Sequence, residues 1–322
     1  MNDVATLPPF VLTAGGTGGH LFPAQALAER LKARGHRLAL ITDRRGDAYG
    51  ESFAGIDTHF IQAAGVSGRG PAAKIVALFR LGIGFFQARR LLREMRPDVV
   101  VGFGGYPTIP TLLAAAHLKL KSVIHEQNAV LGRANRILAP RATRIATAFK
   151  TTAFLRDSDM AKAIWTGNPV RPEIRDIRDK PFPAFGADQP IQILVTGGSQ
   201  GATVFAGVVP AALSALPEAM RRRVKVTQQC RPEDIDSVRA AYDSNGIEAI
   251  LESFFDDLPQ RIAAAHLVIC RAGQSTTAEL TSDGRPAITV PYTQAIDDHQ
   301  TAHAASLCAH VRAWKLPNRA AQ

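Results

Sequence analysis

Cysteine and aromatic residues are scarce in this chain, and both shortages exclude function classes. The three cysteines, Cys230, Cys270 and Cys308, form no CxxC pair. A disulfide framework is therefore not expected. We expect buried thiols in a reducing compartment instead. Aromatic residues make up only 7% of the chain. No recognition helix, zinc finger or aromatic RNA-binding strand is visible, so no nucleic-acid partner is predicted despite the net charge of +10. A basic chain of this kind instead suits an anionic membrane surface or a phosphorylated substrate.

A long uninterrupted apolar segment is also lacking. Residues 99–118 carry no charge and are numerous enough to cross a bilayer, but glycines and prolines interrupt them at Gly102, Gly104, Gly105, Pro107 and Pro110. This pattern predicts a strand, a loop and a helix rather than a membrane span. The N-terminus shows no basic segment followed by an apolar one, so a secretory signal is not expected.

Metal-binding patterns are equally weak. Two Asp-x-Asp triplets occur, at Asp157–Asp159 and Asp234–Asp236. Neither follows a strong apolar strand, and we interpret both as solvated surface. The sequence therefore predicts no metal site and no cofactor.

What the chain does have is two glycine-rich turns, each between an apolar strand and a helix. Residues 15–20 (GGTGGH) follow the predicted strand Phe10–Thr13, and residues 197–201 (GGSQG) follow the predicted strand Ile191–Thr196. Such a turn brings backbone N–H groups close to an anion, and the helix dipole favours negative charge there. Two such units predict two nucleotide-binding domains, with a cleft between them for a phosphorylated donor and an acceptor.

Both halves of the chain alternate between strand and helix patterns, which predicts an α/β fold with two doubly wound parallel sheets. Pro23 is expected in the first turn of the first helix. A proline-rich, charged stretch between Pro169 and Pro190 predicts a linker. The further strands expected are Leu38–Thr42, Val99–Phe103, Ser122–His125, Val224–Thr227, Glu248–Leu251, Leu267–Cys270 and Ala287–Val290.

Seven motifs in register, from residue 15 to residue 300, resemble the MurG family of bacterial peptidoglycan glycosyltransferases. Besides the two turns they are GGYP at 104–107, HEQN at 125–128, GNPVR at 167–171, CRAG at 270–273 and DDHQ at 297–300. The resemblance implies a GT-B fold of two Rossmann-like domains. Residues 1–172 would bind the acceptor and the membrane, and residues 173–322 would bind UDP-N-acetylglucosamine.

The resemblance also implies a reaction and a location. N-acetylglucosamine would pass from UDP-N-acetylglucosamine, with inversion, to the 4-hydroxyl of the muramyl sugar of lipid I, giving lipid II at the cytoplasmic face of the bacterial inner membrane. Two departures from the family pattern stand out. Only residues 301–322 follow the DDHQ motif, fewer than the family normally has, and His303 replaces the usual Asn. A UDP-binding protein inactivated by C-terminal truncation therefore remains an alternative.

The chemistry requires a general base for the acceptor hydroxyl and stabilisation of the departing diphosphate. His20, at the end of the first glycine-rich turn, is the first candidate for the base because its ordinary pKa lies near working pH. Glu126 is the competing catalytic candidate, and Asp43 is a weaker one. The resemblance implies donor-binding roles for Thr17, Gly18, Gly19, Asn128, Arg171, Ser199, Gln200, Phe255, Arg271, Glu279 and Gln300. It implies acceptor-binding roles for Gly16, Thr17, Tyr106, His125 and Asn135.

Residues 74–86 (KIVALFRLGIGFF) are apolar with interspersed cations, and Arg89, Arg90 and Arg93 follow. Such a helix can lie on an anionic lipid surface. The alternative is a helix buried in the first domain, and the family resemblance favours a partly exposed patch.

Two rival enzyme classes share parts of this sequence pattern. A nicotinamide-dependent oxidoreductase is disfavoured because the first turn continues to Leu21 where the dinucleotide fingerprint needs glycine. A GT-B-like UDP-N-acetylglucosamine epimerase would act on the free nucleotide sugar without a lipid acceptor.

Overall fold

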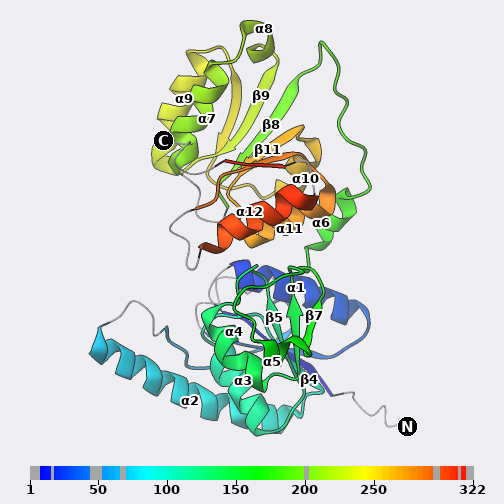
Figure 1. Cartoon of the computed structure of the whole chain (residues 1–322), viewed down its shortest axis with the longest axis vertical. Coiled ribbons are helices and arrows are strands. Elements are labelled where there is room, and N and C mark those ends of the chain that lie inside the picture. The colour runs from blue at the N-terminus through cyan, green and yellow to red at the C-terminus, as the bar shows by residue number, and fades with distance from the viewer. Residues whose placement is uncertain are drawn as a thin grey trace. The chain divides into compact units, whose positions relative to one another are not determined.

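The computed structural model of the chain describes residues 8–15, 18–43, 53–65, 70–198, 203–292, 298–310 and 313–316. The chain divides into two compact units, Met1–Arg171 and Pro172–Gln322 (Figure 1). Each unit is built on its own parallel sheet flanked by helices, as the alternating sequence pattern predicts.

Unit 1 contains a seven-stranded parallel sheet with the order β3-β2-β1-β4-β5-β6-β7. The order runs outward from β1 in both directions, so the sheet is doubly wound. The strands are β1 (Phe10–Thr13), β2 (Leu38–Thr42), β3 (Asp57–Phe60), β4 (Val99–Gly102), β5 (Ser122–Glu126), β6 (Arg144–Thr147) and β7 (Ala163–Trp165). The helices are α1 (Gly18–Ala33), α2 (Pro71–Met95), α3 (Thr108–His117), α4 (Arg133–Leu138), the 3-10 helix η2 (Ala139–Arg141) and α5 (Asp157–Met160).

The two faces of this sheet carry separate apolar cores because successive strand residues point to opposite sides. Val11 of β1 packs with Leu92 of α2 on one face. Leu12, the next residue, packs with Leu21 of α1 on the other. All four side chains are essentially inaccessible to solvent. The sheet is thus covered on both faces, which explains the continuous apolar runs in β1 and β4.

Unit 2 contains a six-stranded parallel sheet with the order β10-β9-β8-β11-β12-β13. The strands are β8 (Ile191–Thr196), β9 (Val224–Gln229), β10 (Glu248–Glu252), β11 (Leu267–Cys270), β12 (Ala287–Thr289) and β13 (Ala313–Lys315). The helices are α6 (Pro172–Ile177), α7 (Thr203–Ser214), α8 (Glu218–Arg221), the 3-10 helix η3 (Pro232–Asp234), α9 (Ile235–Asp243), α10 (Leu258–Ala264), α11 (Gln274–Asp283) and α12 (His299–His310).

Three local predictions were wrong. Helix α1 begins at Gly18, so Pro23 lies inside it rather than in its first turn. The proline-rich stretch is not only a linker, since α6 forms within it and contacts α10 and α11. Its Ile174 and Ile177, three residues apart, are buried. The apolar burial of these two side chains explains why a helix forms despite the surrounding prolines and charges.

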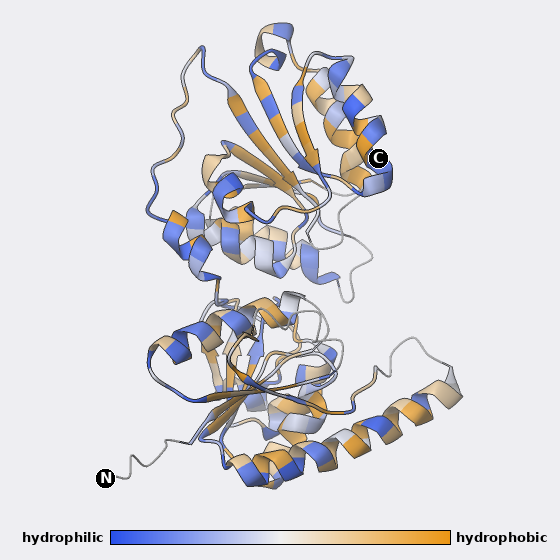
Figure 2. Ribbon diagram, turned by 180° about the vertical axis from the view of Figure 1, so that it is seen from behind, coloured by the Kyte–Doolittle hydropathy of each residue, from blue (hydrophilic) through white to orange (hydrophobic). Residues whose placement is uncertain are grey.

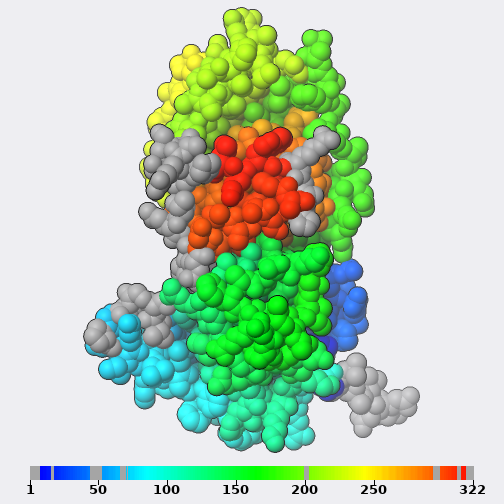
Figure 3. All heavy atoms as spheres, in the orientation of Figure 1, coloured from blue at the N-terminus to red at the C-terminus, as the bar shows by residue number. Residues whose placement is uncertain are grey.

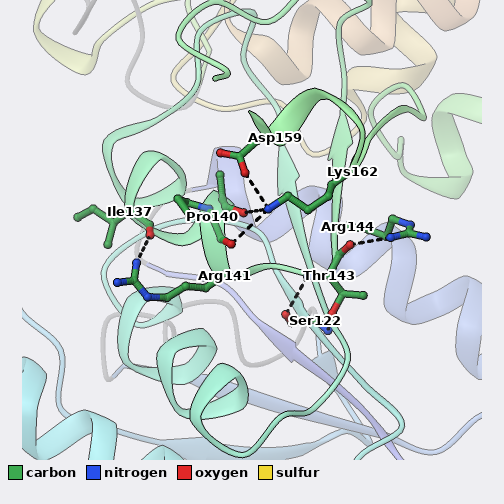
Figure 4. A network of polar contacts seen from close by, with 9 residues as sticks. Ser122, Ile137, Pro140, Arg141, Thr143, Arg144, Asp159 and Lys162 are labelled. Carbon is green, nitrogen blue, oxygen red and sulfur yellow. Dashed lines mark hydrogen bonds and ion pairs between the residues drawn. The ribbon is translucent and has the colours of Figure 1, made fainter. Parts of the chain in front are cut away.

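Asp159 is the third correction, because it is buried and not solvated. Lys162 lies 2.7 Å from its Oδ1 and donates hydrogen bonds to the carbonyls of Ala139 and Pro140 at 2.8 and 3.3 Å (Figure 4). Asp159 thus binds the lysine that holds the end of α5 against η2, whereas Asp157 is exposed as predicted.

Residues 99–118 form β4, a turn and α3, as predicted. Across the described ranges, no helix combines the length and apolarity that crossing a bilayer requires. Helix α2 is the longest helix, and it extends well past the sheet of unit 1 (Figure 1).

Candidate functional site

The carboxyl ends of β1 and β4 meet through two glycine-containing turns in unit 1. The Gly15 N–H donates to the Gly104 carbonyl at 3.2 Å, and the Phe103 N–H donates to the Thr13 carbonyl at 2.8 Å. A Cβ on Gly105 would stand 2.9 Å from the Cα of Gly15. Side chains are therefore excluded here, and the two backbones approach at the sheet edge where open α/β sheets bind ligands.

His20 lies in the first turn of α1, directly beside this junction. Its Nδ1 is 3.3 Å from Oε1 of Gln127, and Gln127 Nε2 donates to the Phe103 carbonyl at 2.7 Å. Burial lowers the pKa of His20, while the Glu126 carboxylate and hydrogen bonds to Gln127 and Phe103 oppose that effect. The net lowering keeps the imidazole neutral near pH 7, which is the form that can accept a proton.

Glu126 ends β5 and is almost completely buried. Its Oε1 accepts from the backbone N–H and the side-chain amide of Asn128, both at 2.9 Å. Its Oε2 accepts from the Gly132 N–H at 2.7 Å and from Asn135 Nδ2 at 2.8 Å. Four N–H groups thus donate to the two oxygens, and these hydrogen bonds hold the β5–α4 loop in one conformation.

His125, the preceding residue, is buried against the ring of Phe103. Its Nε2 lies 3.2 Å from the Gly167 carbonyl, which can only accept, so Nε2 carries the proton. Burial lowers the pKa of His125. Its Nδ1 has no hydrogen-bond partner within the described ranges. That nitrogen is a hydrogen-bond acceptor in the neutral ring.

The remaining candidates of unit 1 lie close to these turns. The Tyr106 ring packs on Gly65, where a Cβ would be 2.5 Å from the tyrosine Cζ. The Arg171 guanidinium lies 5.2 Å from the centroid of the Phe22 ring on α1. Gly18 and Gly19 are the first residues of α1. Gly16 and Thr17, predicted to bind acceptor and donor groups, lie outside the described residues.

In unit 2, the second glycine-rich turn follows β8 in the same way. Gln229 Oε1 accepts from Thr196 Oγ1 at 3.0 Å and from the Gly197 N–H at 3.3 Å, and Gln229 Nε2 donates to the Ser253 carbonyl at 3.2 Å. Gly198 adopts a positive φ of 78°, which glycine tolerates best. The predicted donor-binding residues Ser199 and Gln200 lie outside the described residues.

Arg271 and Gln300 converge on the segment after β12. The Arg271 guanidinium donates to the carbonyls of Val290 and Pro291 at 3.0 and 3.3 Å, and burial lowers its pKa. Gln300 Oε1 accepts from the Tyr292 N–H at 2.8 Å. Two side chains that the sequence places 29 residues apart thus hold one loop.

Phe255 is buried, and the Arg261 guanidinium lies 4.3 Å from its ring centroid. Arg261 also pairs with Glu252 and Asp257.

Glu279 is buried in the middle of α11. His303 of α12 is fully buried, and its Nδ1 lies 3.0 Å from the Ala272 carbonyl. Burial is the main cause that lowers the pKa of His303 to about 4.

Sequence reasoning missed two glutamines that organise these turns. Gln127 and Gln229 each bond two separate segments through one amide. Gln127 stands within the HEQN motif, but a neutral amide gives no sign of which backbone groups it will reach. Among the described residues no group of three or more His, Cys, Asp or Glu side chains could hold a metal ion.

Comparisons with known proteins agree with this architecture. Residues 10–147 match the Glycosyltransferase family 28 N-terminal domain, and residues 192–322 match the corresponding C-terminal domain. The chain is 54% identical, over 94% of its length and 82% of the relative's, to a protein of Paramagnetospirillum magneticum named UDP-N-acetylglucosamine--N-acetylmuramyl-(pentapeptide) pyrophosphoryl-undecaprenol N-acetylglucosamine transferase. It is 53% identical, over 96% of its length and 79% of the relative's, to the protein of the same name from Rhodospirillum rubrum.

Solved structures give the same picture. The crystal structure of Acinetobacter baumannii MurG matches with a TM-score of 0.77 and 29% identity, covering 97% of this chain and 86% of that one. A UDP-GlcNAc 2-epimerase from Neisseria meningitidis matches with a TM-score of 0.61 at 14% identity, covering 90% and 84%. At that identity the second likeness concerns the fold alone.

Proposed function

The chain belongs to glycosyltransferase family 28, and on that premise we propose that it transfers N-acetylglucosamine from UDP-N-acetylglucosamine to the lipid-linked muramyl-pentapeptide. The observation that carries this proposal is the identity of about half of all residues, over nearly the whole chain, with transferases named for that reaction. The GT-B fold and the expected activity thus agree with the resemblance found in the sequence.

The transfer forms a bond from the acceptor 4-hydroxyl oxygen to the sugar C1 and breaks the bond from C1 to the diphosphate oxygen. A single displacement inverts the configuration at C1. The hydroxyl proton passes to the base, and the electron pair leaves with UDP. In unit 1 we assign the base to His20, because its lowered pKa keeps it neutral and because it lies half-buried at the carboxyl edge of the sheet. Glu126 suits a structural role better, because four N–H donors already occupy its oxygens.

In this proposal unit 1 serves the acceptor and part of the donor, and unit 2 serves the donor. In unit 1, Nδ1 of His125, which has no hydrogen-bond partner among the described residues, serves the acceptor together with Tyr106 and Asn135. In unit 2, we assign the donor diphosphate to the glycine-rich turn after β8, because a turn of this kind that opens a helix favours an anion. Further donor contacts are assigned to Arg171, Asn128, Phe255, Arg271, Glu279 and Gln300, to Gly18 and Gly19, and to Thr17, Ser199 and Gln200, which lie outside the described residues.

We also propose that the chain associates peripherally with the cytoplasmic face of an anionic bilayer, and helix α2 supports the contact with a bilayer. One face of the helix is buried, whereas large apolar side chains on it stay exposed at Ile75, Val76, Leu78, Phe79 and Phe86. Apolar segments alternate with polar ones along the projecting helix, and its atoms lie on the surface of unit 1 (Figures 2 and 3). Lys74, Arg80 and Arg90 are exposed on the same helix. Exposed apolar area with flanking cations is the composition that interfacial helices use.

Product analysis tests the proposed activity. The protein is mixed with UDP-N-acetylglucosamine labelled in the sugar, with and without lipid I in detergent micelles. We expect UDP release only with lipid I, in step with labelled lipid II. Formation of UDP-N-acetylmannosamine without lipid I would instead identify an epimerase. Binding of UDP without turnover in either mixture would identify an inactive relative.

A further inference from the structure

The side chain of Gln127 bridges a backbone carbonyl and the imidazole of His20. Gln127 is 1% exposed, so its amide cannot rely on water. Its Nε2 is 2.7 Å from the Phe103 carbonyl, and its Oε1 is 3.3 Å from Nδ1 of His20. Because a buried amide needs partners at both ends, these two contacts define its orientation.

The Phe103 carbonyl fixes the direction of the hydrogen bonds that link Phe103, Gln127 and His20. A backbone carbonyl can only accept, so the NH₂ end of Gln127 must face Phe103. The Oε1 end then faces His20 and can only accept as well. Nδ1 of His20 must therefore carry a proton, and Nε2 of the neutral ring is left with its lone pair. The tautomer of His20 thus follows from the orientation of the Gln127 amide, which the Phe103 carbonyl fixes.

We propose that Gln127 is a positioning residue that holds His20 in the Nδ1–H tautomer, so that Nε2 is the atom that takes the acceptor proton. The inference rests on the proposed function for the identity of that proton, but the tautomer itself does not depend on it. Gly104 also packs against the ring, since a Cβ there would be 2.9 Å from the ring Cε1 and Nδ1. The Gln127 amide and the backbone of Gly104 thus hold the imidazole ring in place.

A neutral amide suits this role better than a carboxylate would. The titratable group that acts on His20 by charge is Glu126, which raises the histidine's pKa. A second carboxylate at position 127 would raise it further and stabilise the imidazolium, which cannot accept a proton. It would also set an oxygen against the Phe103 carbonyl. Glutamine orients the ring without adding charge.

The tautomer can be measured directly by NMR of the full-length protein labelled with ¹⁵N-histidine, using His20→Gln to assign the signals. Two-bond ¹H–¹⁵N correlations distinguish the Nδ1–H and Nε2–H forms. We expect neutral His20 in the Nδ1–H form in the wild type. An Nε2–H form there would overturn the proposal without any need for a variant.

Gln127→Met keeps the side-chain length but removes both amide groups, and Gln25→Met on α1 is the matched control. We expect Gln127→Met to populate the Nε2–H form and to lower kcat by roughly 10- to 100-fold with unchanged affinity for UDP-N-acetylglucosamine. The acid limb of the variant's profile of kcat against pH should move to lower pH, because a hydrogen bond that raises the pKa of His20 is lost. An unchanged tautomer and pH profile in the folded variant would refute the role.

These readouts separate the two proposals. If wild-type His20 is in the Nδ1–H form and Gln127→Met shifts it to the Nε2–H form, but no lipid II is made, the positioning by Gln127 stands and the proposed function fails. If lipid II is made but His20 is in the Nε2–H form, the function stands and the positioning fails.

Discussion

Gly104 lies against the imidazole of His20 so closely that a Cβ on the glycine would be 2.9 Å from both Cε1 and Nδ1 of the ring. Gly104 also has a φ of 97°, a conformation that other residues rarely adopt. The turn after β4 and the first turn of α1 therefore pack directly against one another. The position of the proposed base depends on Gly104 having no side chain.

Gly104→Ala should lower both stability and activity. The Cβ must displace the His20 ring, and the positive φ adds strain of about 1–3 kcal/mol. We expect kcat to fall at least about tenfold in the fraction that remains folded. Gly207→Ala in α7 is the control, because nothing lies within 4 Å of its Cβ position. Wild-type turnover per folded Gly104→Ala molecule would show that this contact does not position the base.

Glu126→Gln separates a structural role from a catalytic one. The glutamine oxygen can replace one carboxylate oxygen, but its NH₂ group would face two N–H donors. Leaving buried donors without acceptors should lower the free energy of unfolding by roughly 3 kcal/mol, measurable by urea denaturation. If stability is unchanged while kcat falls about a thousandfold, the glutamate acts on the reacting atoms instead.

The buried His303 should make unit 2 sensitive to acid. Its pKa is about 4 in the folded chain and about 6.5 in an unfolded one. Between these two pH values the unfolded state binds a proton at this site and the folded state does not. The free energy of unfolding therefore falls as the pH drops from about 6.5 to about 4. The loss from this one group is on the order of 3 kcal/mol.

His303→Asn tests that assignment, since asparagine can still donate to the Ala272 carbonyl but does not titrate in this range. We expect the variant to lose less stability than the wild type between pH 7 and pH 4.5, as measured by urea denaturation at each pH. Identical slopes of stability against pH would assign the acid sensitivity to other groups.

Leu78→Ser combined with Phe79→Ser should weaken binding to anionic liposomes. Both side chains are about two-thirds exposed on α2, so the change costs little folding stability. Removing two apolar side chains from a lipid surface should lower partitioning by about tenfold or more. Ile250→Ser with Phe254→Ser, exposed in unit 2, is the control. Equal partitioning of both double variants would remove α2 as the membrane contact.

The sequence predicted the central strands well, because buried parallel strands are continuous apolar runs. The bounds of β8 and β11 were predicted without error. The strands β3, β7 and β13, at the edges of the sheets, were not predicted, since they are short and largely exposed. The inner strand β6 was also missed, because it is short and only two of its four residues are buried. A strand with one unpaired edge and no buried face lacks the apolar pattern on which prediction depends.

The site was predictable in its residue types but not in its connections. The turn residues and His20 could be found from glycine spacing and motif order. The occupation of Glu126 by four N–H donors could not, because it depends on how the β5–α4 loop folds around the end of β5. The bridge through Gln127 could not, because it depends on where the Phe103 carbonyl, just after β4, lies relative to α1. The contact between Gln127 and His20, which are 107 residues apart, is decided by packing of the whole sheet.

The pH dependence of lipid II formation by wild-type protein and His20→Gln tests the central claim most directly. With His20 as the base, the variant should lose about two to four orders of magnitude in kcat while keeping its affinity for UDP-N-acetylglucosamine. The acid limb of the wild-type profile, which reports a histidine with a pKa below 6.5, should disappear. Turnover within a few-fold of wild type, with the acid limb intact, would contradict the account.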